Sequence, residues 1–105
     1  MIIKKKIAWW ERVEGAEKYH VRIVDTGIVT AIEQLENIGF AVVPQSANPE
    51  IDADINTLGL PVGEGTYDVF ISAADSVGNE SDPLEFRGAV FDFTPPASPT
   101  RGGFR

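Results

Sequence analysis

The chain has 105 residues, enough for one hydrophobic core. Its 16 acidic and 9 basic residues give a net charge of −7, which argues against a nucleic-acid-binding surface, since such surfaces neutralise phosphates with Lys and Arg. Without cysteine the chain forms no disulfide and no thiolate zinc site. No apolar run reaches the roughly 18 residues of a membrane span, and the first residues lack the apolar segment of a secretory signal. These features leave the location open between the cytoplasm and export as part of a larger assembly.

Two strands joined by a turn are predicted at the start, over residues 7–13 and 19–24. Gly15 lies in the turn between them, where its backbone freedom is useful. In the second strand alternate residues differ in polarity, so Tyr19 faces a core while His20 and Arg22 face solvent.

The first strand contains the tandem tryptophans Trp9 and Trp10. Neighbouring side chains of a strand point to opposite faces, so only one of the two rings can enter a given core. The other ring is expected on the surface.

Residues 28–50 allow two interpretations. Thr30 followed by Glu33 has the pattern of a capping box, which predicts a short helix over residues 31–38. The alternative is an extended connection with a short strand at residues 40–43.

Three more strands follow. Residues 51–56 and 66–75 alternate between apolar and polar side chains, and the second of these runs places Tyr67 inward and Phe70 outward. A last strand is expected over residues 84–93, with a break at Gly88. Residues 94–105 are rich in Pro and Gly and are predicted to be a flexible tail, which leaves residues 1–93 as the domain.

Several short strands with turns between them predict an all-β fold, an antiparallel β-sandwich. Three motifs in this order resemble a fibronectin type III domain of the immunoglobulin-like superfamily, of the bacterial or phage type. They are W-E-x-V-x-G-A-x-x-Y at residues 10–19, L-P-x-G-x-G-T-Y at 60–67 and A-A-D-S-V-G-N-E-S-D-P at 73–83. The resemblance implies four structural core residues, namely Trp10, Tyr19, Leu60 and Tyr67.

The chain departs from this family at its start. Only MIIKKK precedes the strand predicted over residues 7–13, so the family's strand A is expected to be short or absent. A missing strand A leaves an open sheet edge, which recruits other strands unless it is covered or charged.

No group of residues predicts catalysis, a cofactor or a metal. His20 is the only histidine and has no accompanying nucleophile motif. Residues 52–56 read D-A-D-I-N, like the start of a calcium loop, but Thr57 stands where glycine is needed and Gly63 where an acid is needed. Outward acids that alternate along a strand explain this run without a metal, and a looser calcium site at Asp75, Glu80 and Asp82 is favoured over it as a metal site.

The predicted interaction residues face outward, with the aromatic ones as anchors: Trp9, Phe70, His20 and Arg22. They are expected to form two patches, with Trp9 on the sheet of the first strand and Phe70, His20 and Arg22 on the other sheet. We therefore expect a non-catalytic structural or protein–protein interaction module that associates with itself or with a larger assembly. The alternative is a carbohydrate-binding accessory module that stacks sugars on Trp9 or Phe70.

Overall fold

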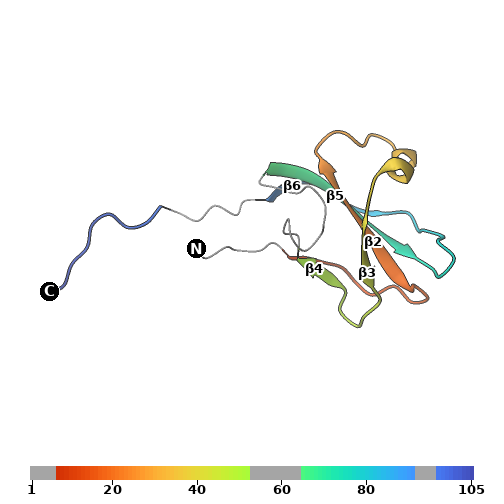
Figure 1. The fold of residues 1–105 in the computed structure, drawn as a ribbon, viewed down its shortest axis with the longest axis horizontal. Helices are drawn as coiled ribbons and strands as arrows, with labels where there is room; N and C mark the ends of the chain where they lie inside the picture. The colour runs from red at the N-terminus through yellow and green to blue at the C-terminus, as the bar shows by residue number, and fades with distance from the viewer. Residues whose placement is uncertain (1–6, 53–64, 92–96) are drawn as a thin grey trace.

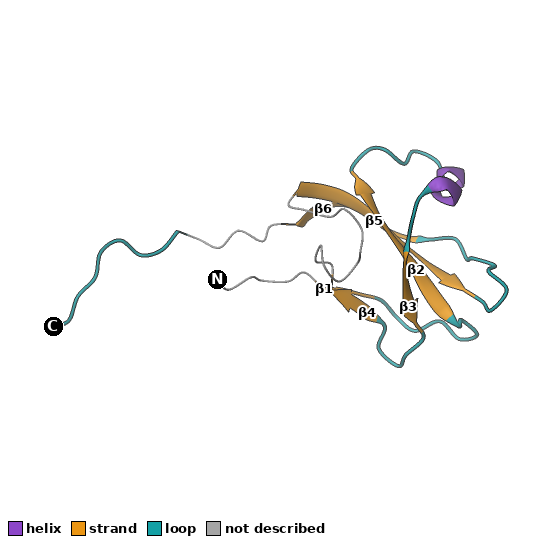
Figure 2. Cartoon of the chain, viewed as in Figure 1, coloured by secondary structure: helices purple, strands orange, loops and turns teal. Residues whose placement is uncertain are grey.

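The computed structural model describes residues 7–52, 65–91 and 97–105. This part of the chain is mostly β, as predicted, and its strands form two antiparallel sheets (Figures 1 and 2). The elements are β1 (Ile7–Trp9), β2 (Lys18–Asp25), the 3-10 helix η1 (Ile32–Asn37), β3 (Ala41–Pro44), β4 (Glu50–Asp52), β5 (Gly65–Ala74) and β6 (Leu84–Phe91). The smaller sheet pairs β1 with β4, and the larger has the order β3-β2-β5-β6.

The main core lies on the face of the larger sheet that carries Tyr19 and Val21 of β2 and Val69 and Ile71 of β5. These residues alternate along their strands, as a half-buried sheet requires. Trp10, directly after β1, packs into the same cluster, and its ring meets the Tyr19 ring edge-on at 5.3 Å.

Of the other residues implied by the family resemblance, Tyr67 also lies in this core, with 9% of its surface exposed. Leu60 lies outside the described residues.

The Tyr19 hydroxyl fixes the segment after Trp10. It accepts a hydrogen bond from the Val13 amide at 2.9 Å and donates one to Gln45 Oε1 at 2.6 Å. The Gln45 side chain in turn donates to the Val13 carbonyl at 2.8 Å. Tyr19 is 1% exposed, and its buried hydroxyl has hydrogen-bond partners. These hydrogen bonds connect the segment after β1 to the residue after β3.

The other face of the larger sheet is covered by the connection between β2 and β3, which carries η1 (Figure 2). Val29 and Leu35 of this connection pack on Phe70 of β5, which is completely buried. The expected exposure of Phe70 is therefore wrong, because both faces of β5 are covered.

Both interpretations of residues 28–50 are present at once, since η1 is followed by the strand β3. The expected capping box does not form between Thr30 and Glu33. Instead, Gln34 Oε1 accepts hydrogen bonds from the amides of Thr30 and Ala31, at 2.6 and 2.8 Å. A side chain one position later thus satisfies the amides at the start of η1.

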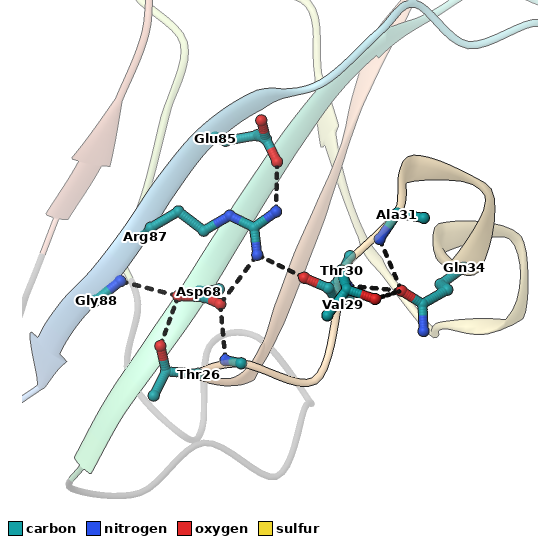
Figure 3. A network of polar contacts seen from close by, with 10 residues as sticks. Thr26, Val29, Thr30, Ala31, Gln34, Asp68, Glu85, Arg87 and Gly88 are labelled. Atoms are coloured by element: carbon teal, nitrogen blue, oxygen red, sulfur yellow. Dashed lines mark hydrogen bonds and ion pairs between the residues drawn. The ribbon is translucent and has the colours of Figure 1, made fainter.

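A β-bulge replaces the break expected at Gly88. Asp68 of β5 faces two residues of β6, Arg87 and Gly88, and Gly88 adopts a φ of +69°. The buried Asp68 carboxylate accepts four hydrogen bonds, one each from Thr26, Gly27, Arg87 and Gly88 (Figure 3). It joins β6 to the turn that follows β2.

Candidate interaction site

An open apolar groove of about 680 Å³ borders the main core between β1 and β6. The N-terminal part contributes Ala8, Trp9, Trp10 and Val13. Strand β6 contributes Leu84, Phe86 and Ala89. Inward residues of β2 and β5 complete it, so the groove opens directly onto the core.

Trp9 is the most exposed large apolar side chain among the described residues of the groove, at 69%, while Leu84, Val13 and Phe86 are between 41% and 48% exposed. Contiguous exposed apolar surface of this kind is typical of interaction sites, whereas isolated exposed residues are ordinary. The exposed Trp9 therefore belongs to a surface that extends to β6.

The groove lies beside terminal strands of both sheets. Among the described strands, β1 pairs only with β4, and β6 pairs only with β5. Among the described residues, the polar groups that line the groove, on Glu11, Ser81 and Asp82, include two carboxylates and no basic side chain. The site combines an apolar interior with a negative border.

A second hollow of about 390 Å³ also includes Trp9 and is more polar. It is lined in addition by Glu11, Arg12, Asn48 and Glu50. Trp9 thus contributes to two neighbouring depressions of different chemistry.

His20 and Arg22 take part in a buried polar cluster, and their expected solvent exposure is wrong. They are 5% and 3% exposed. Glu80 accepts hydrogen bonds from Arg22 at 2.9 and 3.0 Å and lies 2.5 Å from His20 Nδ1. Phe40 covers both residues: its ring stacks on His20 at 3.9 Å, and the Arg22 guanidinium lies 4.8 Å from the ring centre.

The charges of this cluster determine which of its atoms donate and which accept hydrogen bonds. The bidentate hydrogen bonds from Arg22 are the main cause that lowers the pKa of Glu80 to about 2, and His20 adds to the effect against the opposing cost of burial. At neutral pH Glu80 is thus a carboxylate, which makes His20 Nδ1 the donor. His20 Nε2 is buried and has no partner among the described residues. The cluster fastens the β5–β6 turn to β2 and presents no open reactive group.

Asp75 of the β5–β6 turn is also held by hydrogen bonds within the protein. Asp75 accepts hydrogen bonds from the amides of Val77 and Asn79 and from the Asn79 side chain. The Asn79 side chain is the main cause that lowers the pKa of Asp75. Within the described ranges, no group of three or more His, Asp and Glu side chains is placed to hold a metal ion. Most of the calcium-like run at residues 52–56 lies outside those ranges.

The structure places Trp9 apart from the other three predicted interaction residues, as the sequence predicts. Trp9 lies at the groove, whereas His20, Arg22 and Phe70 lie on the opposite, covered face of the larger sheet. Sequence reasoning missed Leu84 and Phe86. Their two-residue spacing places both on the groove side of β6, where they pair with Ile71 and Val69.

Comparison with protein-family models, curated proteins and solved structures found no match for this chain. In the part of the chain that the structure describes, no helix is both long and apolar enough to cross a membrane.

Proposed function

We propose that this chain is a fibronectin type III-like β-sandwich. The three sequence motifs support this assignment, and so does the packing of Trp10 against Tyr19 in one core. The consecutive order β2-β5-β6 agrees with the C-F-G order of such a sheet, with β3 in the place of an added C′ strand.

Its proposed function is that of a non-catalytic module that binds an extended, apolar segment of a protein partner in the groove between β1 and β6. The observation that carries this function is the exposure of Trp9 beside Leu84 and Phe86 at one open groove. Tryptophan is enriched among the residues that dominate binding energy, and terminal strands of sheets commonly receive an extended segment. The buried polar clusters elsewhere serve stability.

The test is a titration of the full chain with a panel of extended peptides whose alternate residues are apolar. Binding is followed by tryptophan fluorescence and by amide chemical shifts. We expect shifts at Ala8, Val13 and Leu84, and a Trp9→Ser variant should weaken binding about tenfold or more.

Val77→Ser is the matched control, because Val77 is 81% exposed and does not line the groove. The proposal is wrong if no peptide of the panel shifts the groove residues, or if Trp9→Ser and Val77→Ser bind equally well.

The second candidate function is carbohydrate binding at the smaller hollow. There the Trp9 ring lies beside Glu11, Asn48 and Glu50, a combination of stacking surface and hydrogen-bonding groups that suits a sugar. A glycan array separates the two functions, because peptide binding requires Leu84 and Phe86, and sugar binding at the smaller hollow does not.

A further inference from the structure

We propose that the occupant of the groove is residues 97–105 of a second copy of this chain, which gives a head-to-tail assembly. This inference rests on the proposed function, because it names the partner of the same groove. Three features carry it: the position of this segment, its charge and its sequence.

Residues 97–105 lie outside the folded body. They have no regular secondary structure, every one of them is exposed, and the segment runs away from the sheets (Figure 1). The molecule is correspondingly long, 65 Å against 31 and 20 Å in the other two directions. Phe104 near the end of the segment is fully exposed. An apolar ring in that position is available to a neighbouring molecule.

The charges of the segment and of the body are complementary. All 16 acidic residues and seven of the nine basic residues lie in residues 1–96, which gives this part a charge of −9. Residues 97–105 carry Arg101 and Arg105 and hence +2. The groove has Glu11 and Asp82 at its border, and none of the described residues that line it is basic. A basic segment with one aromatic ring therefore matches an apolar groove with an acidic border.

The sequence of the segment suits close docking along a strand. Gly102 and Gly103 lie between Arg101 and Phe104, so the backbone can approach the groove wall without side chains in between. Nine extended residues reach about 30 Å, which exceeds the length of either β1 or β6. Phe104 can enter beside Trp9 while the two arginines stay at the border.

This contact joins two different surfaces, the groove of one molecule and the tail of the next. Such heterologous contacts produce rings or open chains of molecules. A symmetric contact between two grooves would instead produce a closed dimer. The two arrangements respond differently to substitutions in the tail, and this difference makes the inference testable.

The experiment uses two full-length variants, Trp9→Ser with an altered groove and Phe104→Ser with an altered tail. Both sites are exposed, and circular dichroism confirms that each variant is folded. A Leu84→Gln variant alters the groove at a second position, and Val77→Ser is the control. Mass is measured by light scattering over a range of protein concentrations, at low and high salt.

We expect the wild-type chain and Val77→Ser to associate, with weaker association at high salt. Each of the two variants alone should be a monomer of 11.4 kDa. Their mixture should form a 1:1 complex of twice that mass, because the intact tail of one fits the intact groove of the other. The loss for each variant should be about 30-fold or more in dissociation constant.

Several results would overturn the inference. One is a wild-type chain that stays monomeric at every concentration, as docking of the chain's own tail would give. Another is a Phe104→Ser variant that associates like the wild type, which indicates a groove-to-groove dimer. A third is a mixture that forms no complex. If the groove still binds apolar peptides in these cases, only the tail assignment fails; if it binds none, the proposed function fails as well.

Discussion

Replacing Asp68 with asparagine removes the one negative charge that joins the turn after β2 to the bulge in β6. Asp68 is 1% exposed, and each of its oxygens accepts two hydrogen bonds. Oδ1 receives the Thr26 hydroxyl at 2.9 Å and the Gly88 amide at 2.8 Å; Oδ2 receives the Gly27 amide at 3.1 Å and Arg87 at 3.3 Å. An asparagine must point its NH₂ group at one of these pairs of donors.

The magnitude follows from the pKa of this group. The hydrogen bond from the Gly88 amide, followed by that from Gly27, lowers the pKa of Asp68 from 3.8 to about 2 despite its burial. A shift of this size corresponds to about 2 kcal/mol of folding stability. The donors left without an acceptor add to it, so Asp68→Asn should cost about 2–4 kcal/mol at pH 7.

The sign of the pH dependence is fixed by the direction of the shift. Because the pKa is lower in the folded chain, the stabilisation is complete above pH 3.8 and is lost as the pH falls towards 2. The difference in unfolding free energy between wild type and Asp68→Asn should therefore shrink over that interval.

Urea unfolding at pH 7, 5, 3 and 2.5 measures this difference in unfolding free energy. The contributions of the other acidic residues cancel in the difference, because both proteins contain them. Asp25→Asn is the control, since it makes the same chemical change at an exposed position at the end of β2. A loss at Asp68 no larger than at Asp25, or a difference that stays constant with pH, would refute the reasoning.

Three further predictions concern stability and are checked by urea unfolding. Phe70→Ala should lower the free energy of unfolding by about 3–5 kcal/mol, whereas Trp9→Ala should change it by no more than about 0.5 kcal/mol, because only the Phe70 ring is buried. Equal losses for the two variants would contradict this assignment. Glu80→Gln should lower the free energy of unfolding by about 2–3 kcal/mol, since Arg22 stays buried without its counter-charge. This loss should diminish as the pH falls from 4.5 to about 2. Adding Arg22→Met to Glu80→Gln should recover part of the lost stability. Gly88→Ala should cost about 1 kcal/mol from its positive φ alone, as nothing lies within 4 Å of the added carbon.

The sequence predicted the elements better than it predicted what covers them. Alternation of apolar and polar residues placed Tyr19 and Tyr67 on one face of the sheet, because each strand position has only two possible directions. The same pattern marks the opposite face as polar but says nothing about a connection that folds across it. His20 and Arg22 therefore looked solvated, although Glu80 and Phe40 bury them.

A signal for this second layer was present in the connection. Val29, Leu35 and Ile38 are apolar residues of this connection, and all three pack around Phe70. A long connection that carries its own apolar residues needs a surface on which to bury them. The outward Phe70 supplied that surface, which is why an aromatic residue stands at an apparently solvated position.

Coverage of the larger sheet on both faces restricts where a partner can bind. One face is occupied by the core and the other by the connection with η1, and the apolar groove lies at the edge, where the core meets β1 and β6. An extended segment docked there would lie along the terminal strands β1 and β6, and this physical match favours a strand-like partner over a globular surface.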